Sequence, residues 1–252
     1  MMSIMTKILC FFHYKGGVGK SVTSAATGAN LASRGFKVLL MDLDSQANLT
    51  KNMLGPSDQK ETVLTTFQKG KFPIQKIHEN LYIVPSGKSV AALSATLDRN
   101  QMDLLKKALE KVKGQFDFVI LDCPPAIGMI TINAIRSSDY LFVPVLADQS
   151  SFDDLDDTSI VAIKATGGKM NMSGIFFTQF ESNLNISKEM VEQVKERYGD
   201  LLMTTRIRKC SKVKEALTAR KDLFSYAPNC TAAQDYVSLV DEILDITKAN
   251  KQ

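Results

Sequence analysis

The sequence lacks three features: a long apolar run, a paired cysteine motif and a strong excess of one charge. No apolar stretch approaches the roughly 18 residues of a membrane span, and no small-residue cleavage site precedes the first glycines, so we expect a cytoplasmic protein. The 31 basic against 27 acidic residues give a charge of +4, too mild to identify a nucleic-acid binder. Four widely spaced cysteines without a C-x-x-C pair predict reduced, structural thiols: Cys10, Cys123, Cys210 and Cys230.

Internal repeats and low-complexity linkers are also missing, so we expect one domain over residues 1–252. Short β-branched or aromatic runs alternate with amphipathic stretches: KILCFF, KVLLMDLD, LYIVPS, FDFVILD, YLFVPV and GIFFTQF are the runs. This α/β alternation predicts a doubly wound, mostly parallel sheet with helices on both faces. We expect the first helix from about Gly19 to Arg34, and short helices and loops over residues 54–80.

The most informative stretch reads KGGVGKS over residues 15–21, between an apolar run and the start of a helix. This is the context of a phosphate-binding loop, in which glycines let backbone N–H groups face phosphate oxygens. Lys20 would reach the β- and γ-phosphates, and Ser21 would coordinate Mg²⁺. The predicted cofactor-binding residues are Lys15, Gly16, Gly17, Val18, Gly19, Lys20, Ser21 and Val22.

The loop departs from the standard G-x-x-x-x-G-K-[ST] pattern, because Tyr14 stands where the first glycine would be. The form K-G-G-x-G-K-[ST] is the deviant Walker A motif, and the sequence resembles the ParA/MinD family of P-loop NTPases, above all short Soj-like partitioning proteins. In that family the lysine at the position of Lys15 reaches across a dimer interface to the partner's ATP. The resemblance implies an ATP-sandwich homodimer with catalytic roles for Lys15 and Lys20.

Three aspartates end two of the apolar runs, where ligands of open α/β sheets bind. Asp42 and Asp44 lie in a stretch that resembles the family's D-x-D-P-Q-x-N, which implies that Asp44 positions the attacking water and Asp42 belongs to the Mg²⁺ shell. Asp122 has the form of a Walker B aspartate that holds Mg²⁺. Ser45 replaces the family's proline, and Val22 replaces a hydroxyl that could meet the α-phosphate, so we expect a looser loop and weaker ATP binding.

A basic segment over residues 206–221 concentrates cations against few acids. Family members that bind DNA non-specifically use basic residues in this region, and phosphate contacts need only charge and reach. The predicted DNA-binding residues are Arg206, Arg208, Lys209, Lys212, Lys214 and Arg220. The alternative is an amphipathic helix whose charges only face solvent.

Other branches of the family fit less well. Membrane-binding members end in a detachable amphipathic helix, whereas the tail here carries acids and an apolar stripe typical of a packed helix: Tyr236, Leu239, Val240, Ile243 and Leu244. About six residues precede the first apolar run, too few for a helix-turn-helix domain, and the cysteines and tyrosines do not match iron–sulfur or kinase relatives. We expect no membrane partner.

Together the motifs predict a slow, partner-stimulated ATP hydrolase that dimerises with ATP, binds DNA non-specifically and positions plasmid or chromosomal DNA. A ParB-like or other adaptor would trigger hydrolysis, and the ATP-bound form would associate with the nucleoid. Two alternatives remain open. One is a MinD-like factor that acts on a membrane or protein partner, and the other is a P-loop enzyme that phosphorylates a small substrate, which Lys15 disfavours.

Overall fold

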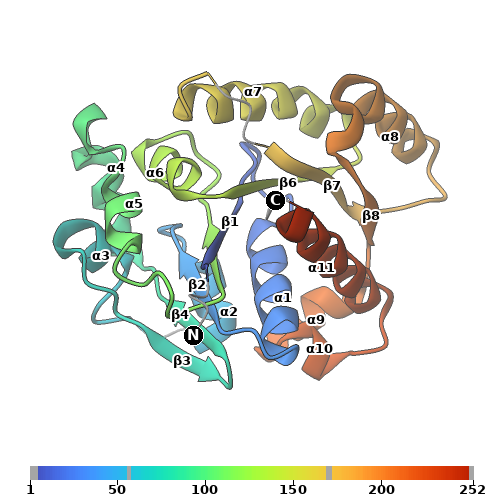
Figure 1. Cartoon of the computed structure of the whole chain (residues 1–252). Helices are drawn as coiled ribbons and strands as arrows, with labels where there is room; N and C mark the ends of the chain where they lie inside the picture. Colours follow the sequence, from blue (N-terminus) through green and yellow to red (C-terminus); the bar gives the residue numbers. More distant parts are fainter. Residues whose placement is uncertain (1–4, 56–57, 169–171, 250–252) are drawn as a thin grey trace.

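A single eight-stranded sheet runs through the computed structural model, which describes residues 5–55, 58–168 and 172–249 (Figure 1). The strand order is β3-β4-β2-β5-β1-β6-β7-β8, and every neighbouring pair is parallel except β3 with β4. The strands are β1 (Lys7–Phe11), β2 (Val38–Asp42), β3 (Gln75–His78), β4 (Leu81–Val84), β5 (Phe118–Asp122), β6 (Tyr140–Leu146), β7 (Met172–Phe180) and β8 (Leu202–Arg208). The predicted doubly wound α/β class is confirmed.

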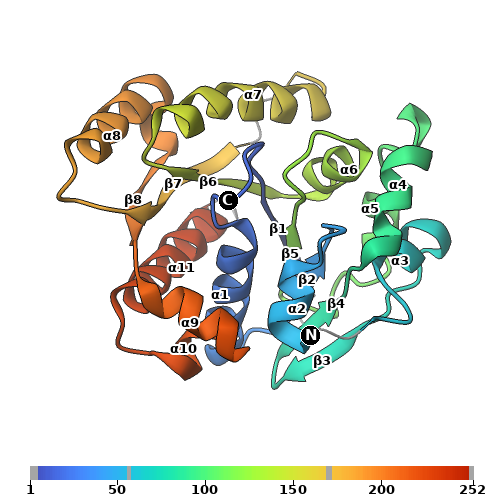
Figure 2. The same ribbon diagram turned by 180° about the vertical axis from the view of Figure 1, so that it is seen from behind.

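Helices cover both faces of the sheet (Figures 1 and 2). One face carries α3 (Val63–Lys69), α4 (Ala91–Thr96), α5 (Leu104–Leu109), α6 (Met129–Ser137), α7 (Gln149–Ala165) and α8 (Asn185–Tyr198). The other carries α1 (Lys20–Ser33), α2 (Asn48–Leu54), α9 (Ser211–Ala219), α10 (Leu223–Tyr226) and α11 (Thr231–Ala249). Three short 3₁₀ turns, Lys88–Val90, Arg99–Gln101 and Gly199–Leu201, complete the described elements.

The central strand β1 shows why the sheet is covered on both sides. Ile8, Cys10 and Phe12 pack into the core beneath α3 to α8, whereas Leu9 and Phe11 pack beneath α1 and α11. Successive side chains of a strand point to opposite faces, so an unbroken apolar run requires two apolar layers. The same run therefore fixes β1 in the middle of the sheet, with its carboxyl end directed at the loop before α1.

The terminal helix α11 is packed against α1 and β8, as Figure 2 shows from behind. The predicted apolar stripe is fully inside the core, at 0–8% exposure: Tyr236, Leu239, Val240, Ile243 and Leu244. The prediction of a packed terminal helix is confirmed over the described residues. None of the described helices is both long and apolar enough to cross a bilayer.

Two edge strands were not predicted. β3 and β8 lie at opposite edges of the sheet, and along each of them buried or half-buried positions are interspersed with exposed ones. Edge strands bury less of their surface, so polar side chains break up the apolar run that marks a strand. The basic segment is consequently not one helix, because Arg206 and Arg208 lie on β8 and only residues from Ser211 onward are helical.

Candidate nucleotide site

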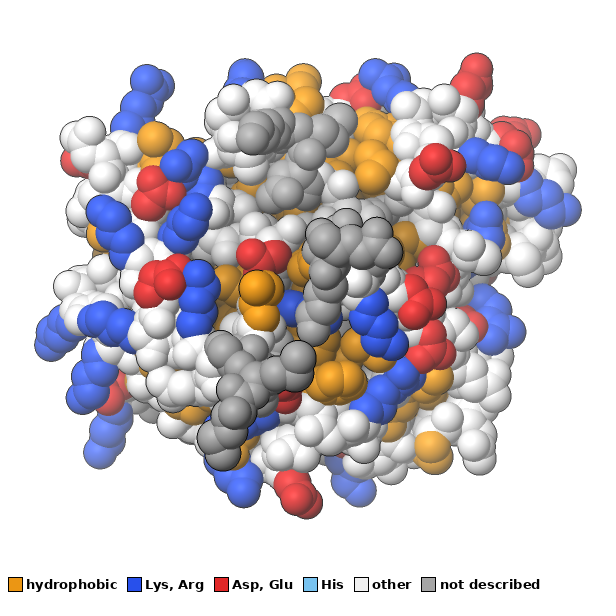
Figure 3. Space-filling view, in the orientation of Figure 1, with side chains coloured by type: hydrophobic (Ala, Val, Ile, Leu, Met, Phe, Trp, Pro, Cys, Tyr) orange, Lys and Arg blue, Asp and Glu red, His pale blue; other side chains and the backbone are white. Residues whose placement is uncertain are grey.

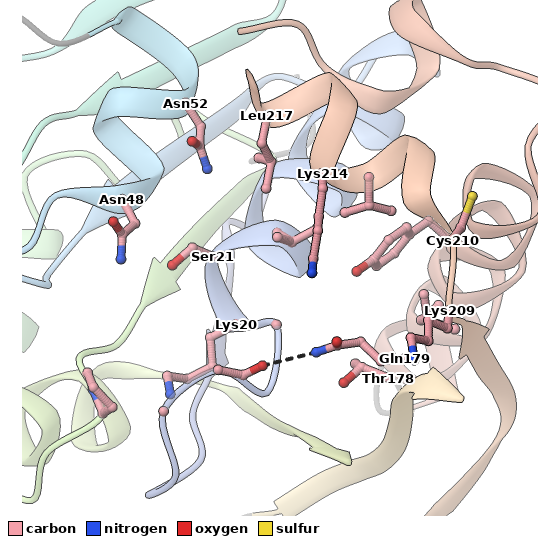
Figure 4. Close-up of a pocket in the computed structure, with 18 of the residues that line it drawn as sticks. Lys20, Ser21, Asn48, Asn52, Thr178, Gln179, Lys209, Cys210, Lys214 and Leu217 are labelled. Carbon is pink, nitrogen blue, oxygen red and sulfur yellow. Dashed lines mark hydrogen bonds between the residues drawn. The ribbon is translucent and has the colours of Figure 1, made fainter. Parts of the chain in front are cut away.

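The loop between β1 and α1 is shaped by two glycines with left-handed backbone, Gly17 at φ 78° and Gly19 at φ 87°. Any other L-residue would be strained there. Strand β7 holds the loop from outside. The Thr178 hydroxyl donates to the Val18 carbonyl at 2.8 Å, and the Gln179 amide donates to the Gly17 carbonyl at 3.1 Å (Figure 4). The predicted loop thus leads directly into the N-terminus of α1, where helix geometry favours an anion.

A cavity of about 580 Å³ opens beside this loop, within the size range of small-molecule sites. Its lining includes the glycine loop and the start of α1, through Gly16, Gly17, Gly19 and residues 20–22, and the apolar or aromatic side chains of Ile207, Val213, Leu217 and Tyr236. The remaining wall includes Asp44, Asn48 and Asn52 on one side and Thr178 and Gln179 on the other (Figure 4). A lining that combines a helix N-terminus with apolar side chains suits a nucleotide's phosphates and base.

Lys20 is a buried cation in this lining, only 7% exposed. Its ammonium donates to the carbonyl oxygens of His13 at 3.1 Å and Lys15 at 2.9 Å. Burial lowers the pKa of Lys20, because the charged form loses solvation that two carbonyls only partly replace. An anionic ligand beside this ammonium would restore that lost stabilisation.

Asp42 and Asp122 sit opposite each other in the register of β2 and β5, and both are fully buried. Asp42 accepts hydrogen bonds from the Asp44 N–H at 3.1 Å and from the Thr50 N–H and hydroxyl at 2.8 and 2.7 Å. Asp122 accepts one from the Ser24 hydroxyl at 3.1 Å, and its Oδ2 has no hydrogen-bond partner among the described residues. Burial raises the pKa of both carboxyls, and their proximity raises that of Asp122 further.

The oxygen atoms at this end of the site are suitable ligands for a magnesium ion. A buried carboxylate oxygen without a partner is costly unless a cation neutralises it, and Asp122 supplies one behind Ser21, which lines the cavity. Mg²⁺ needs only one or two protein ligands when phosphates and water supply the rest. Within the described ranges no group of three or more His, Cys, Asp or Glu side chains could hold a metal by itself. Both carboxylate oxygens of Asp42, unlike Oδ2 of Asp122, accept hydrogen bonds, Oδ1 from the Asp44 N–H and Oδ2 from Thr50.

Asp44 lies on the cavity wall with 8% exposure, and its Oδ1 accepts the Gln46 N–H at 2.9 Å. Ser45 stands in place of a proline in the loop around Asp44. The loop is nevertheless restrained at both ends, because Asp42 accepts hydrogen bonds from the Asp44 N–H and from the Thr50 N–H. These hydrogen bonds restrain the loop that we expected to be loose. Asp44 is therefore held at the position from which a carboxylate could orient water.

Lys15 does not line the cavity that its own loop forms. Its ammonium instead pairs with Asp148 Oδ1 at 2.9 Å, outside the cavity. Asp148 follows β6 and caps α7 by accepting the Ser151 N–H at 2.7 Å. Burial raises the pKa of Asp148, but the hydrogen bonds from Lys15 and Ser151 outweigh it and lower the pKa below its usual value. In the sequence, Asp148 is only an acid that follows an apolar run, so nothing there predicts this pairing.

His13 is a second residue that sequence reasoning missed. It is fully buried just after β1, its Nδ1 accepts the Lys15 N–H at 2.9 Å, and its Nε2 lies 3.3 Å from the Ser151 carbonyl. Since Nδ1 accepts, Nε2 carries the proton and donates. Burial and the nearby Lys20 cation lower the pKa of His13 to about 4. A neutral histidine therefore ties the phosphate loop to α7.

The predicted DNA residues fall into two groups in the structure. Three are paired with acids: Arg208 with Asp235 at 2.6 Å, Lys209 with Glu181 at 2.9 Å and Lys212 with Glu215 at 2.8 Å. The other three make no ion pair within the described residues: Arg206, whose guanidinium lies 5.6 Å from the Phe180 ring centre, Lys214 and Arg220. Only Lys214, Arg208 and Lys209 of the six line the cavity.

The cysteines match the expectation of reduced thiols, since all four are free. Cys10 and Cys123 are buried as predicted, with sulfur atoms 3.4 Å apart. Cys210 and Cys230 are partly exposed and pack against the core beneath α11.

The glycine loop, the buried Lys20 and the strand-end aspartates define a P-loop nucleotide-binding protein with a deviant Walker A motif. A sequence profile described as an AAA domain matches residues 6–173. The sporulation initiation inhibitor protein Soj of Bacillus subtilis is 32% identical over 95% of this chain and 98% of its own. The chromosome-partitioning ATPase Soj of Treponema pallidum is 30% identical over the same shares.

Among solved structures, cobyrinic acid a,c-diamide synthase from Mycobacterium smegmatis, with bound ATP analogue and magnesium, has the same fold. Its TM-score is 0.83 at 24% identity, covering 98% of this chain and 97% of that one. The chain belongs to the ParA/MinD family and is an ATP hydrolase.

Proposed function

We propose that this protein is a ParA-type partitioning ATPase. Its ATP-bound homodimer binds DNA without sequence preference, and hydrolysis releases it, so that plasmid or chromosomal DNA is positioned. One relative is a chromosome-partitioning ATPase by name and aligns over 95% of this chain, which supports the same task here. Residues 1–252 would form one ATPase domain that acts in the cytoplasm and associates with the nucleoid when ATP is bound.

ATP and Mg²⁺ fit the site through residues already in place. The loop N–H groups and Lys20 would bind the phosphates, and Ser21 with Asp122 would hold the metal. Bound Mg²⁺ supplies positive charge beside the phosphates during hydrolysis. Asp44, on the cavity wall, would orient the attacking water, and the hydrogen bond from the Gln46 N–H keeps its carboxylate in position.

The position of Lys15 carries the dimer proposal. Its ammonium lies outside its own cavity and is held by one ion pair, with its side chain 25% and that of Asp148 45% exposed. Such exposed pairs contribute little, about 0–1 kcal/mol, so a triphosphate could replace Asp148 as its partner. A second subunit facing this loop would offer that triphosphate. ATP binding and dimerisation would then be linked.

DNA binding is supported by the place of the basic segment rather than by overall charge. Figure 3 shows Lys and Arg side chains spread over one face and mixed with acidic ones, so net charge defines no patch there. The basic segment, in contrast, runs along the cavity from Ile207 to Leu217. Nucleotide and DNA would therefore both contact the segment formed by β8 and α9. An adaptor protein would stimulate hydrolysis.

The two alternatives make different predictions. A membrane-directed factor would need a terminal helix free to insert, whereas the apolar stripe of α11 is packed against α1 and β8. That packing favours DNA over a membrane. A small-substrate kinase would transfer phosphate to an acceptor other than water.

The test is a DNA mobility shift with wild type and Lys15→Gln, with ATP, ADP or no nucleotide, at two salt concentrations. We expect wild type to bind only with ATP, more weakly at the higher salt, and the variant not to bind. Lys164→Gln, an exposed lysine on α7, is the matched control. If wild type dimerises with ATP yet never binds DNA, the DNA proposal is wrong, and lipid co-sedimentation becomes the next measurement.

A further inference from the structure

Lys214 is unlike the other cations of the basic segment. It projects from α9 into the nucleotide cavity, and its ammonium end points toward the start of α1, which carries Lys20 and Ser21 (Figure 4). No acid pairs with it among the described residues, whereas Lys212, on the same helix, is paired with Glu215. The side chain is thus a solvent-exposed cation without an acidic partner among the described residues, and it faces the nucleotide cavity.

Several positive features surround this one space. Arg208 and Lys209 are paired with acids, whereas the N-terminus of α1, Lys20 and Lys214 have no acid paired with them among the described residues. Like charges directed at a common cavity repel one another unless an anion lies between them. Asp44 also lines the cavity but makes no ion pair with Lys214, and the nearby Asn48 and Asn52 are neutral amides. The cavity is therefore arranged for a ligand with negative charge beyond the reach of Lys20.

The location of Lys214 indicates which part of the ligand it meets. Val213 and Leu217, on the same helix as Lys214, are apolar and suit a base, whereas the glycine loop suits the outer phosphates. The phosphate nearest the base lies between them. Val22, in the first turn of α1, also lines the cavity, and its side chain cannot donate a hydrogen bond.

We propose that Lys214 binds the nucleotide itself by donating to the α-phosphate, in place of the hydroxyl that Val22 lacks. This inference rests on the nucleotide site proposed above and removes one residue from the set of DNA contacts. Because the α-phosphate is common to ATP, ADP and AMP, Lys214 contributes to binding all three. It also joins α9 to the bound nucleotide, so the basic segment is ordered by ADP as well as by ATP.

The test measures the dissociation constants of ATP, ADP, AMP and adenosine, with Mg²⁺, for wild type, Lys214→Ala, Lys214→Arg and Lys164→Ala. A charge-assisted hydrogen bond predicts about a tenfold or greater loss for ATP, ADP and AMP in Lys214→Ala. Adenosine affinity stays unchanged, Lys214→Arg retains most of the affinity, and Lys164→Ala behaves as wild type. Thermal unfolding without nucleotide shows that each variant is folded.

A second readout is the reactivity of lysine amines toward an acylating reagent, followed by mass spectrometry. ADP should protect Lys214 while Lys212 remains as reactive as before. Unchanged nucleotide affinity in Lys214→Ala, or loss of DNA binding alone, overturns the inference and returns Lys214 to the DNA contacts. If wild type binds nucleotide but never DNA, only the proposed partitioning role fails, whereas absence of nucleotide binding by wild type removes both.

Discussion

The two walls of the nucleotide cavity hold their charges in opposite ways. On the side of the start of α1 and the ends of β2 and β5, Lys20 lines the cavity, Asp42 and Asp122 do not, and all three are buried, with hydrogen bonds to most of their polar atoms. On the wall formed by β8 and α9, the cations are mostly exposed, and nearby acids pair with several of them. The fold therefore holds each buried charged side chain in a single position. Exposed ones exchange partners at little cost, so the comparison separates a fixed chemical site from an adjustable binding surface.

The largest expected effect tests the buried wall. Lys20→Ala removes the buried ammonium and leaves the His13 and Lys15 carbonyls without that donor. We expect ATP hydrolysis to fall about 10²–10³-fold, the loss typical of a preorganised charged donor. Single-turnover hydrolysis measures it, with Lys164→Ala as the charge-matched control. Wild-type turnover in Lys20→Ala would mean that the phosphates bind elsewhere.

His13 gives the next effect, through pH. Its pKa of about 4 in the folded protein lies below 6.5, so below that pH the unfolded chain binds a proton that the folded one does not. Stability is therefore lost as pH falls from 6.5 toward 4, by about 2 kcal/mol between pH 7 and 5. Urea unfolding at both pH values should show a smaller decrease for His13→Gln. Equal decreases would show that the histidine is not buried neutral.

A pair of substitutions then distinguishes the two buried carboxyls. Burial raises the pKa of Asp122 in the folded protein above its value in the unfolded chain. The folded state therefore loses stability as pH rises toward the folded pKa. Asp122→Asn should raise Tm of the nucleotide-free protein at pH 8 by about 2–4 °C per kcal/mol gained, while removing the response to Mg²⁺. Asp42→Asn should lower Tm, because Thr50 and Asp44 donate to both carboxylate oxygens. Scanning calorimetry tests both signs, and an identical response would contradict the distinction.

The smallest effect concerns the exposed wall. Arg220 has no side-chain partner within the described residues, whereas Arg208 is held by Asp235. Arg220→Ala should weaken ATP-dependent DNA binding and reduce the slope of log affinity against log salt by about 0.9. Arg208→Ala should change that slope less and stability more. Salt titrations of DNA binding measure the slopes, and equal slopes would mean that the Asp235 pair opens on DNA.

Much of the fold could be predicted, because strands buried on both faces need continuous apolar runs. β1, β5 and β6 have such runs, whereas the edge strands β3 and β8 do not. In the sequence the residues of β8 therefore resemble a charged segment and not a strand. The reason is the position of β8 at the edge of the sheet, where a strand keeps one side in water and its buried and exposed residues are mixed.

The amino-acid sequence by itself determined the phosphate loop, because glycines, Lys20 and Ser21 are adjacent in the chain and their roles depend on local backbone geometry. Only the tertiary structure decided which other charges belong to the site. Asp148 meets Lys15 across 133 positions, and Lys214 faces the cavity while Lys212 does not. A charge's role depends on burial and on the partner beside it, and both arise only when distant segments pack together.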